Sequence, residues 1–271
     1  MRQYVAIIAL ALTLQAGMGA HNAAYAQQSQ DSRVADLVQA GVLRFALGLG
    51  TPTTAIKDPE TGELKGAGLE MGRALAARMG VKFTGVEYPR PGAVLDDLSA
   101  NTWDASFLVF DPQRAGQVNF SNPSMQTDFT YLLRPGSTIR SAAQVDQPGI
   151  RIAVPRGDGS DLYLTRTLKY AELIRTESHA AAVQLLRTGG ADAKASPRPV
   201  LAAESVTLPG ARLLSDGFAD ISFAMVLPKA QTAHLAYVNE FIENAKASGL
   251  VQQIIEKVDL QGVRVAPPGK L

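Results

Sequence analysis

The sequence predicts a globular α/β fold built from mostly parallel sheets. Two blocks carry this prediction, Val42–Phe110 and Ile150–Ser215, because in each of them predicted strands alternate with predicted helices. The composition agrees, since 46% of the 271 residues are hydrophobic and 19% are charged, as in ordinary globular proteins. The net charge of +1 gives no reason to expect binding to nucleic acid or to an acidic membrane surface.

The N-terminal segment has the pattern of a targeting signal. Arg2 precedes an apolar run, Val5–Leu14, which is too short to span a bilayer, and Ala24–Tyr25–Ala26 offers the small residues of a cleavage site. A buried amphipathic helix is the alternative, but the run has no polar face. We therefore expect residues 1–26 to be a cleaved secretory signal peptide. The sequence contains no cysteine, so we expect an exported chain without disulfides that is not a lipoprotein.

Each predicted element of the first block is bounded by turn or capping residues. The segment Lys57–Gly66 contains Asp-Pro and Thr-Gly pairs and is expected to be a hairpin tip. Apolar residues at helical spacing, ended by a glycine, predict a helix over Leu69–Gly80. The other expected elements are a helix from Asp31 or Ser32 to Gly41, strands at Val42–Gly50, Val81–Tyr88 and Trp103–Phe110, and a helix at Ala93–Asn101.

The second block and the C-terminal segment continue the alternation. Two apolar strands, Phe129–Arg134 and Ile221–Leu227, flank the second block and could cross between two domains. A long amphipathic helix is expected at Thr232–Ser248, with Leu250–Val258 closing the chain. The remaining expectations are strands at Ile150–Arg156, Ala171–Thr176, Ala191–Ala195 and Ala211–Ser215, and helices at Ser160–Tyr170, His179–Thr188 and Pro197–Glu204.

Signatures of catalysis are scarce. His179 and His234 each lie inside a predicted helix, where a lone histidine is usually structural or solvated, and they are too dispersed to suggest a metal site. The glycines of Gly66–Gly72 do not follow a strand, so they do not fit a dinucleotide-binding turn. No cysteine nucleophile, G-x-S-x-G or P-loop pattern is present. We therefore expect a protein that is not an enzyme and that holds no metal and no cofactor.

The segment Phe110–Pro123 is the first candidate for ligand binding. Asp111 is a natural helix N-cap and Pro112 a natural first residue, while the Asn-Pro pair at its end predicts a turn. Ligands of such folds lie beyond the carboxyl ends of the strands, where the guanidinium of Arg114 could hold a carboxylate through two parallel hydrogen bonds. The alternative is a surface salt bridge from Arg114 to Asp111 or Asp128.

Two further strand ends are candidates. At Arg156–Asp161 a strand gives way to glycines and then to a helix start, where backbone N–H groups can bind anions. Asp158 there would compete with an anionic ligand or attract an ammonium group, or it could simply cap the helix. Arg198 follows another strand end between two prolines, with plain exposure as the alternative.

These landmarks, in this order, resemble the family 3 extracellular solute-binding proteins, the periplasmic receptors of polar amino-acid ABC importers. The resemblance covers about Val38–Val258, and its most specific stretch is D-P-x-R-A…V-x-F-S-x-P. The matching segments are AGVLRFAL, GELKGAGLEMGRALAARMGV, TWDASFLVFDPQRAGQVNFSNP, GIRIAVPRGDG, LLRTGGADA and ISFAMVLPK.

The resemblance implies a two-lobe type II periplasmic binding protein fold, with two sheets and flanking helices joined by two crossing hinge strands. Lobe 1 would comprise residues 27–132 and 223–271, and lobe 2 residues 133–222. A small polar solute would be captured between the lobes of a monomeric periplasmic protein and delivered to the membrane permease of an ABC importer. The same fold also hosts dehydratase-like or lyase-like periplasmic enzymes and ligand-sensing modules of receptor kinases, which are the alternatives.

The family's ligand-binding positions map onto this chain with departures. Arg114 matches the arginine that clamps the ligand's α-carboxylate, and Gly157–Gly159 match a turn that gives hydrogen bonds. The segment before Arg114 is shorter than usual, however, and Phe107 stands at the first of three positions, 107–109, where small hydroxyl residues are usual. The acidic residue that receives the ligand's ammonium is absent from ADAKASPRP.

We therefore expect a divergent member of the family. Its ligand would be either an amino acid held by Asp158 or an organic acid without an amine, held by Arg114, Arg156 or Arg198. The hydroxyls of Thr51 and Thr53, in a turn where the family usually has an aromatic residue, would give the first lobe a more polar wall.

Overall fold

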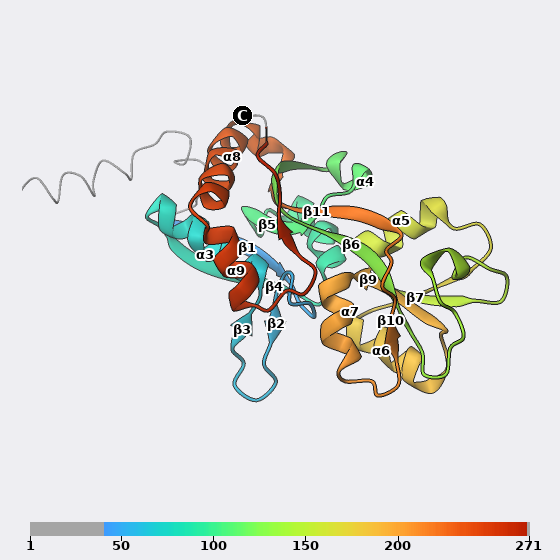
Figure 1. The fold of residues 1–271 in the computed structure, drawn as a ribbon. Coiled ribbons are helices and arrows are strands. Elements are labelled where there is room, and N and C mark those ends of the chain that lie inside the picture. The colour runs from blue at the N-terminus through green and yellow to red at the C-terminus, as the bar shows by residue number, and fades with distance from the viewer. Residues whose placement is uncertain (1–40, 270–271) are drawn as a thin grey trace, which may run out of the picture.

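The computed structural model describes residues 41–269 (Figure 1). The predicted signal peptide and the helix expected before Gly41 lie outside the described residues. Within residues 41–269 no helix is both long enough and apolar enough to cross a membrane.

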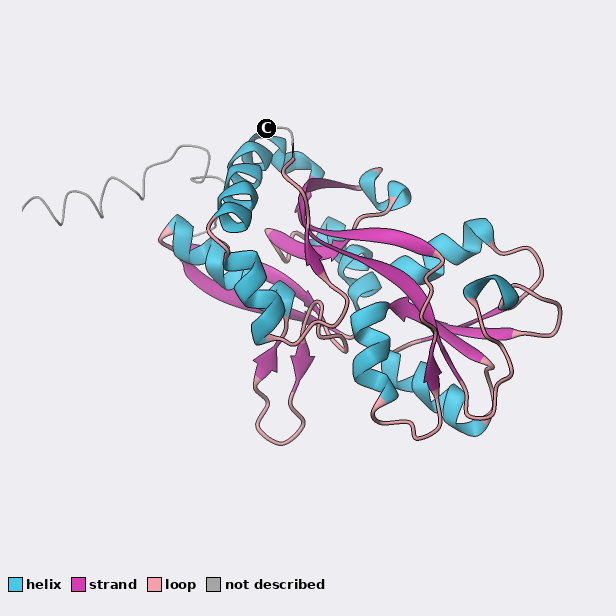
Figure 2. Cartoon of the chain, in the orientation of Figure 1, coloured by secondary structure: helices cyan, strands magenta, loops and turns pink. Residues whose placement is uncertain are grey.

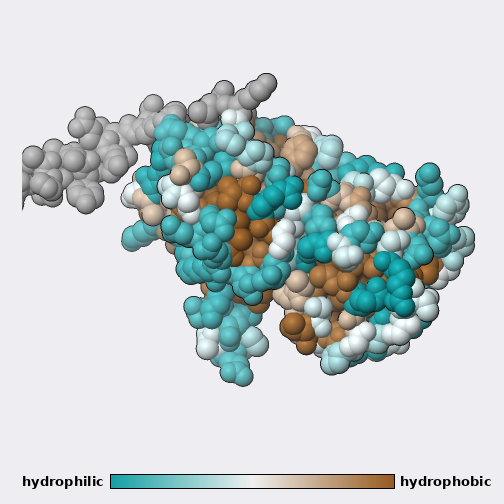
Figure 3. All heavy atoms as spheres, in the orientation of Figure 1, coloured by the Kyte–Doolittle hydropathy of each residue, from teal (hydrophilic) through white to brown (hydrophobic). Residues whose placement is uncertain are grey.

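A ten-stranded sheet organises the chain, in the order β4-β1-β5-β11-β6-β9-β7-β8, with β10 and β12 also paired to β6. A separate two-stranded hairpin, β2–β3, projects from the body with a hydrophilic surface (Figures 2 and 3), as the turn residues of this segment predicted. The strands are β1 Val42–Gly48, β2 Ile56–Lys57, β3 Leu64–Lys65, β4 Lys82–Tyr88, β5 Ala105–Val109, β6 Val118–Leu133, β7 Arg151–Pro155, β8 Glu172–Thr176, β9 Ala193–Pro197, β10 Arg212–Leu213, β11 Ala219–Pro228 and β12 Arg264–Val265.

The two ends of the sheet are parallel, as the strand–helix alternation predicted. Strand β1 pairs in parallel with β4 and β5, and β7 with β8 and β9. Between them run β6 and β11, antiparallel to each other and to their neighbours. The 16-residue β6 pairs with β11 along its first part and with β9 along Phe129–Leu133. The two expected sheets are therefore joined by hydrogen bonds into one.

Helices cover both faces of each half of the sheet (Figure 2). The helix expected at 93–101 is instead a 3-10 segment, η1, that starts at Pro91 and is kinked at Asp97. The helices are α3 Ala67–Met79, η1 Pro91–Ala100, α4 Pro112–Ala115, η2 Ala142–Gln144, α5 Gly159–Thr167, α6 His179–Thr188, α7 Arg198–Ser205, η3 Lys229–Gln231, α8 Thr232–Ala247 and α9 Leu250–Lys257.

The hydrophobic interior forms two cores. The first core draws its buried residues from 43–129 and 221–260, and the second core from 131–214. The C-terminal helices α8 and α9 therefore return to the part of the molecule that holds α3, although 152 residues of sequence lie between α3 and α8 (Figure 1). Strand β6 supplies buried residues to both cores, and Tyr163 of α5 and Phe218 pack against both of them.

The expected Asn122–Pro123 turn is wrong. Both residues lie inside β6, where a proline removes one ladder donor and is normally confined to edges or bulges. The ladder is irregular at this point, with register shifts around Ala224, and the Met225 N–H donates to Ser121 Oγ at 3.0 Å. A bulge in the pairing of β6 with β11 therefore accommodates the Asn-Pro pair, whose sequence alone predicts a turn.

Gly72 lets α3 approach β1, and this contact generates a stability prediction. A Cβ at position 72 would lie 2.8 Å from the ring of Phe45, which is closer than packed atoms tolerate. Alanine normally stabilises a helix interior relative to glycine, but here overpacking should prevail. We expect Gly72→Ala to lower the free energy of unfolding by about 1–3 kcal/mol, measured by urea denaturation. Arg73→Ala, on the exposed side of the same helix, should change it by less than about 0.5 kcal/mol; stabilisation by Gly72→Ala would contradict the packing.

Candidate functional site

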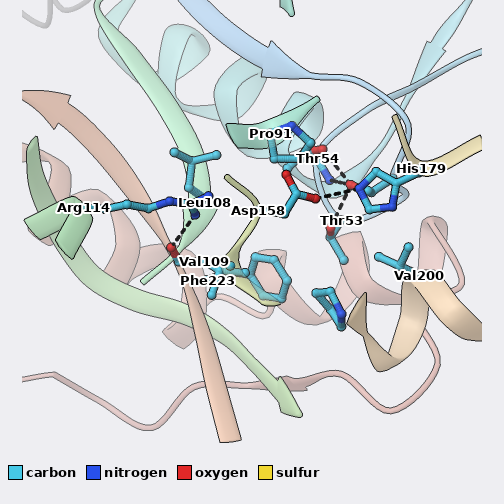
Figure 4. A pocket seen from close by; sticks show the side chains of 13 residues that line it. Thr53, Thr54, Pro91, Leu108, Val109, Arg114, Asp158, His179, Val200 and Phe223 are labelled. Carbon is cyan, nitrogen blue, oxygen red and sulfur yellow. Dashed lines mark hydrogen bonds and ion pairs between the residues drawn. The ribbon is translucent and has the colours of Figure 1, made fainter. Parts of the chain in front are cut away.

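A small cavity of about 20 Å³ lies where the two cores meet (Figure 4). Its walls come from residues at or just after the carboxyl ends of β1, β4, β5, β7, β8 and β9, together with Phe223 of β11. The carboxyl ends of the strands are where ligands of open α/β sheets bind. The lining residues are Thr51, Thr53, Thr54, Pro91, Leu108, Val109, Arg114, Asp158, Gly159, His179, Pro197, Val200 and Phe223.

Three threonines after β1 form one directed chain of hydroxyls. Thr54 Oγ1 donates to the carbonyl of Gly48, so it must accept its bond from Thr51 Oγ1, 2.7 Å away. Thr51 in turn accepts from Thr53, whose Oγ1 lies 3.0 Å away. A hydroxyl has one proton and two lone pairs. Thr53 therefore presents lone pairs, and no free proton, to the cavity.

Asp158 bridges the two cores. It stands at the N-cap position of α5, yet its side chain makes no capping bond, so the alternative of a simple capping role is wrong. Instead Oδ1 accepts from the Gly92 N–H at 3.1 Å, and Oδ2 lies 2.8 Å from His179 Nε2. Position 92 has to be glycine, because a Cβ there would lie 2.7 Å from the carbonyl carbon of Gly157.

His179 begins α6, directly after β8, and leads to a buried ion pair. Lys194 Nζ lies 3.2 Å from His179 Nδ1 and also bonds to Glu204 Oε1. Lys194 is fully buried, His179 is 4% exposed and Asp158 6% exposed. These four side chains form an acid–base chain, Asp158–His179–Lys194–Glu204, that runs from the cavity into the second core.

The chain sets the protonation of its members. Burial and the charge of Lys194 act to lower the pKa of His179, but hydrogen bonds to Asp158 and Glu204 and the charge of Asp158 outweigh them, so this pKa is raised. Burial acts to raise the pKa of Glu204, but Lys194 and His179 outweigh it, so this pKa is lowered. When the imidazole is neutral, Lys194 donates to Nδ1. When it is protonated, Glu204 Oε1, 3.6 Å from Nδ1, is the nearest acceptor.

Arg114 is buried, with 3% of its surface exposed, and it also links the two cores. Its Nη1 donates to the Val109 carbonyl at 3.1 Å and its Nη2 to the Gly157 carbonyl at 2.8 Å, while the buried Nε has no acceptor. Figure 4 shows the side chain extending toward Leu108 and Val109. Burial lowers the pKa of Arg114, an effect opposed by the charges of Asp158 and Asp111.

Neither carboxylate considered from the sequence forms a salt bridge with Arg114. Asp111 does cap α4 as expected, accepting from the Gln113 N–H at 2.9 Å, but its ion pair is with Arg166 of α5 at 2.6 Å. Asp128 pairs with Arg198, whose Nε lies 2.7 Å from Oδ1. The Asp111–Arg166 pair is a further contact between the two sides of the cavity.

The remaining predicted site residues lie outside the cavity lining. Phe107 is part of the first core and stacks on Phe223, with ring centroids 5.8 Å apart. Arg156 pairs with Glu177 at 3.1 Å and its side chain is 54% exposed. Arg198 is held by Asp128 and by the Leu214 carbonyl. Gly157 contacts the site through its backbone, as the acceptor of Arg114.

Sequence reasoning missed His179 and Lys194. His179 follows a strand end, as the predicted site residues do, and this signal could have marked it. Lys194 stands among buried residues of β9, and a lysine in an apolar strand calls for a buried partner. Within residues 41–269 no group of His, Cys, Asp and Glu side chains could hold a metal ion.

The chain matches the family model of the bacterial extracellular solute-binding proteins, family 3, over residues 43–258. It is 19% identical to the ABC transporter glutamine-binding protein GlnH of Bacillus subtilis (strain 168), over 93% of this chain and 94% of that protein. It is 25% identical to the cyclohexadienyl dehydratase of Pseudomonas aeruginosa, over 84% of this chain and 87% of that protein.

A solved structure adds a likeness of fold. The ancestral amino acid-binding protein AncCDT-1, described as a precursor of cyclohexadienyl dehydratase, aligns with a TM-score of 0.72 and 25% identity, over 80% of this chain and 95% of that one. The fold is thus the two-lobe type II periplasmic binding protein fold expected from the sequence. The chain belongs to family 3 of the bacterial extracellular solute-binding proteins.

The raised pKa of His179 predicts a pH-dependent contribution to stability. The protonated ring is favoured in the folded protein, so its contribution is present in full below about pH 6.5, the pKa of an unfolded histidine, and is lost as the pH rises through the raised folded pKa. We expect the difference in unfolding free energy between the wild type and His179→Gln to shrink over this window, measured by urea denaturation at several pH values. A difference that grows with pH would contradict this assignment.

The Lys194–Glu204 pair predicts strongly coupled substitutions. Lys194→Met removes the nearest cation from the buried Glu204 and leaves only His179, 3.6 Å away, which should cost about 3–5 kcal/mol of stability. The double variant Lys194→Met/Glu204→Leu removes both charges and should recover much of that loss, as a double-mutant cycle would measure. Additive losses in the cycle would show that the two side chains are not coupled.

Proposed function

We propose that this protein is a periplasmic receptor that captures a small polar solute, an amino acid or a related carboxylate, between its two lobes and delivers it to an ABC importer. The observation that carries the proposal is the buried Arg114 at the junction of the two cores. An arginine is rarely buried without a carboxylate, and an arginine at a strand end in a closed cavity suits a ligand with an anionic group.

The lobe boundaries expected from the sequence fit the two cores. Lobe 1, residues 27–132 and 223–271, would contain the first core apart from Ile221, and lobe 2, residues 133–222, the second core apart from Tyr131 and Leu132. Strands β6 and β11 would serve as the hinge. A cavity of 20 Å³ has room for little more than one water molecule, so a solute would enter with the lobes apart.

Closure on a solute would rest on contacts that already span the cavity. Asp158 to Gly92, Arg114 to Gly157 and Asp111 to Arg166 each link the two lobes. Separation of the lobes would break these three contacts, and a bound solute would offer new hydrogen-bond or charge partners to the same groups. The signal peptide, periplasmic location, permease partner and monomeric state belong to this proposal, as in a receptor of this family.

An enzyme is the second candidate, because a cyclohexadienyl dehydratase is among the relatives. Its proton-transfer group would have to be His179 or Asp158, which line the cavity. Both nitrogens of His179 are engaged, however, one with Asp158 and the other with Lys194, and this favours a binding protein. A sensory module for a receptor kinase would use the same site.

The first test is a thermal-shift panel on the chain from residue 27, unfolded and refolded to remove bound solutes. The panel contains the twenty amino acids and small mono- and dicarboxylates. A ligand at 100 times its Kd should add about 2.7 kcal/mol, which raises the melting temperature by roughly 5–10 °C for a chain of this size. Silence across the panel would contradict the receptor function, and turnover of a stabilising compound, followed by NMR, would favour an enzyme.

Arg114 generates the matching mutational prediction. Removing one member of a buried, hydrogen-bonded charge pair costs about 2–5 kcal/mol of binding free energy, so Arg114→Gln should raise the Kd of the stabilising solute by about 30-fold or more. The measurement is isothermal titration calorimetry. Arg187→Gln, an exposed arginine of α6, is the control and should leave the Kd unchanged; an unchanged Kd in Arg114→Gln itself would remove Arg114 from the site.

A further inference from the structure

The charges around the cavity are paired except for one. Asp158 is paired with His179, and Glu204 with Lys194. Of the charged side chains described at this site, Arg114 alone has no carboxylate within 4.0 Å, since Asp111 is occupied by Arg166. The missing partner is therefore an anion.

The shape of the free donor indicates which anion. The two Nη groups of Arg114 each donate a hydrogen bond to a backbone carbonyl, while the buried Nε–H has no acceptor. A planar carboxylate can take the Nε–H together with an Nη–H in the parallel arrangement that guanidinium favours. One carboxylate would thus satisfy both the unpaired charge and the unpaired donor.

An ammonium group finds no equivalent place. Asp158 is the one carboxylate among the lining residues, and its two oxygens already accept from Gly92 and His179. A ligand ammonium beside it would also lie close to His179 and the buried charge of Lys194, which repel it. Apart from the threonines, the rest of the wall offers no polar side chain: it consists of Pro91, Leu108, Val109, Gly159, Pro197, Val200 and Phe223.

The one further acceptor is neutral. The hydroxyl chain that ends at the Gly48 carbonyl leaves lone pairs of Thr53 facing the cavity. Such an acceptor fully satisfies the O–H of a ligand hydroxyl, whereas a buried ammonium also needs a counter-charge. A ligand that matches the polar groups of this cavity therefore carries a carboxylate and, at most, a hydroxyl.

We propose that the solute is a small carboxylic or hydroxycarboxylic acid without an ammonium group, recognised by Arg114 in a cavity whose acidic groups are already neutralised. This inference rests on the proposed receptor function and narrows its ligand class. By this inference, Pro197 and Val200, at the start of α7, form an apolar wall at the place where an amino-acid ligand would need a carboxylate for its ammonium group.

The test compares solutes that share a carbon skeleton, on the wild-type chain from residue 27. Three sets are used: alanine, lactate and propionate; aspartate, malate and succinate; phenylalanine, phenyllactate and phenylpropionate. In the set that binds, we expect the amino acid to bind about 100-fold more weakly than the hydroxy or unsubstituted acid, as follows from burying an unpaired charge. Calorimetry gives the Kd values without relying on any variant.

The outcomes separate this inference from the function on which it rests. Tightest binding by the amino acid of a set overturns the ligand class and leaves the receptor function intact. Stabilisation by an amino acid of the full panel, with no response in the three sets, overturns the ligand class in the same way. If no compound stabilises or binds the protein, the receptor function is contradicted, and the proposed ligand class is rejected with it.

Pro197→Asp is the gain-of-function counterpart. Pro197 lines the cavity and is the N-cap residue of α7, a position where aspartate is among the favoured residues, so the helix should tolerate the change. The new carboxylate should lower the Kd of the amino acid of the responding set by about tenfold or more and weaken the ammonium-free acid. Pro197→Ser, another N-cap residue without charge, is the matched control. Equal Kd values for the amino acid in both variants, with the fold intact by circular dichroism, would show that this wall is not the missing amine site.

Discussion

The structure depends on one buried carboxylate, that of Asp158, at the junction of two hydrophobic cores. A carboxylate cannot be buried there unless its oxygens are hydrogen-bonded and its charge is compensated. The first condition brings the Gly92 backbone against α5, and this approach excludes a side chain at position 92. The second places His179 at the start of α6, and the imidazole in turn holds Lys194 and Glu204 in place. The arrangement of four separate segments thus follows from a single charge.

The guanidinium of Arg114 is also a buried charge that needs compensation, but of the opposite sign. Unlike Asp158, which is paired with His179, Arg114 has no charged partner, and this difference explains how the site can act. The charged groups of the acid–base chain are paired with one another, although Glu204 Oε2 lacks a hydrogen bond, whereas the guanidinium is held only by carbonyl dipoles and its buried Nε–H has no acceptor. The paired network reaches the first core through the bond from the Gly92 N–H to Asp158, and in the proposed receptor the buried Nε–H of Arg114 is the donor that a ligand would satisfy. Asp111 contributes to both: it caps α4, which orients Arg114, and pairs with Arg166 across the junction.

Much of the fold could be predicted because its signals are local. The strand–helix alternation, the Asp111–Pro112 helix start and the hairpin at 57–66 depend on neighbouring residues, and the structure contains each of them. The Asn122–Pro123 pair misled because a bulge formed with β11, about 100 residues away in sequence, accepts a proline within the strand. Arg114 and Asp158 could be proposed from their positions at strand ends.

The acid–base chain could not be predicted in the same way. In the sequence, His179 is 21 residues from Asp158 and 15 residues from Lys194. No sequence periodicity predicts such pairings. Arg156 and Arg198 illustrate the converse: both also stand at strand ends, yet nearby Glu177 and Asp128 hold them away from the cavity lining. Which arginine is left without a carboxylate partner is decided by which carboxylates are already within reach of the others.

The separation of the two cores along the sequence also bears on how the chain folds during synthesis. The second core is drawn from one continuous stretch, 131–214, while the first needs residues from both 43–129 and 221–260. Emerging from the ribosome, the chain completes the second core first, while the first half of the sheet still lacks β11, α8 and α9. Until these arrive, the edge of β5 and the apolar face of α3 remain uncovered, and such surfaces favour aggregation. During this interval the exposed strand edge is where a chaperone would have most to bind.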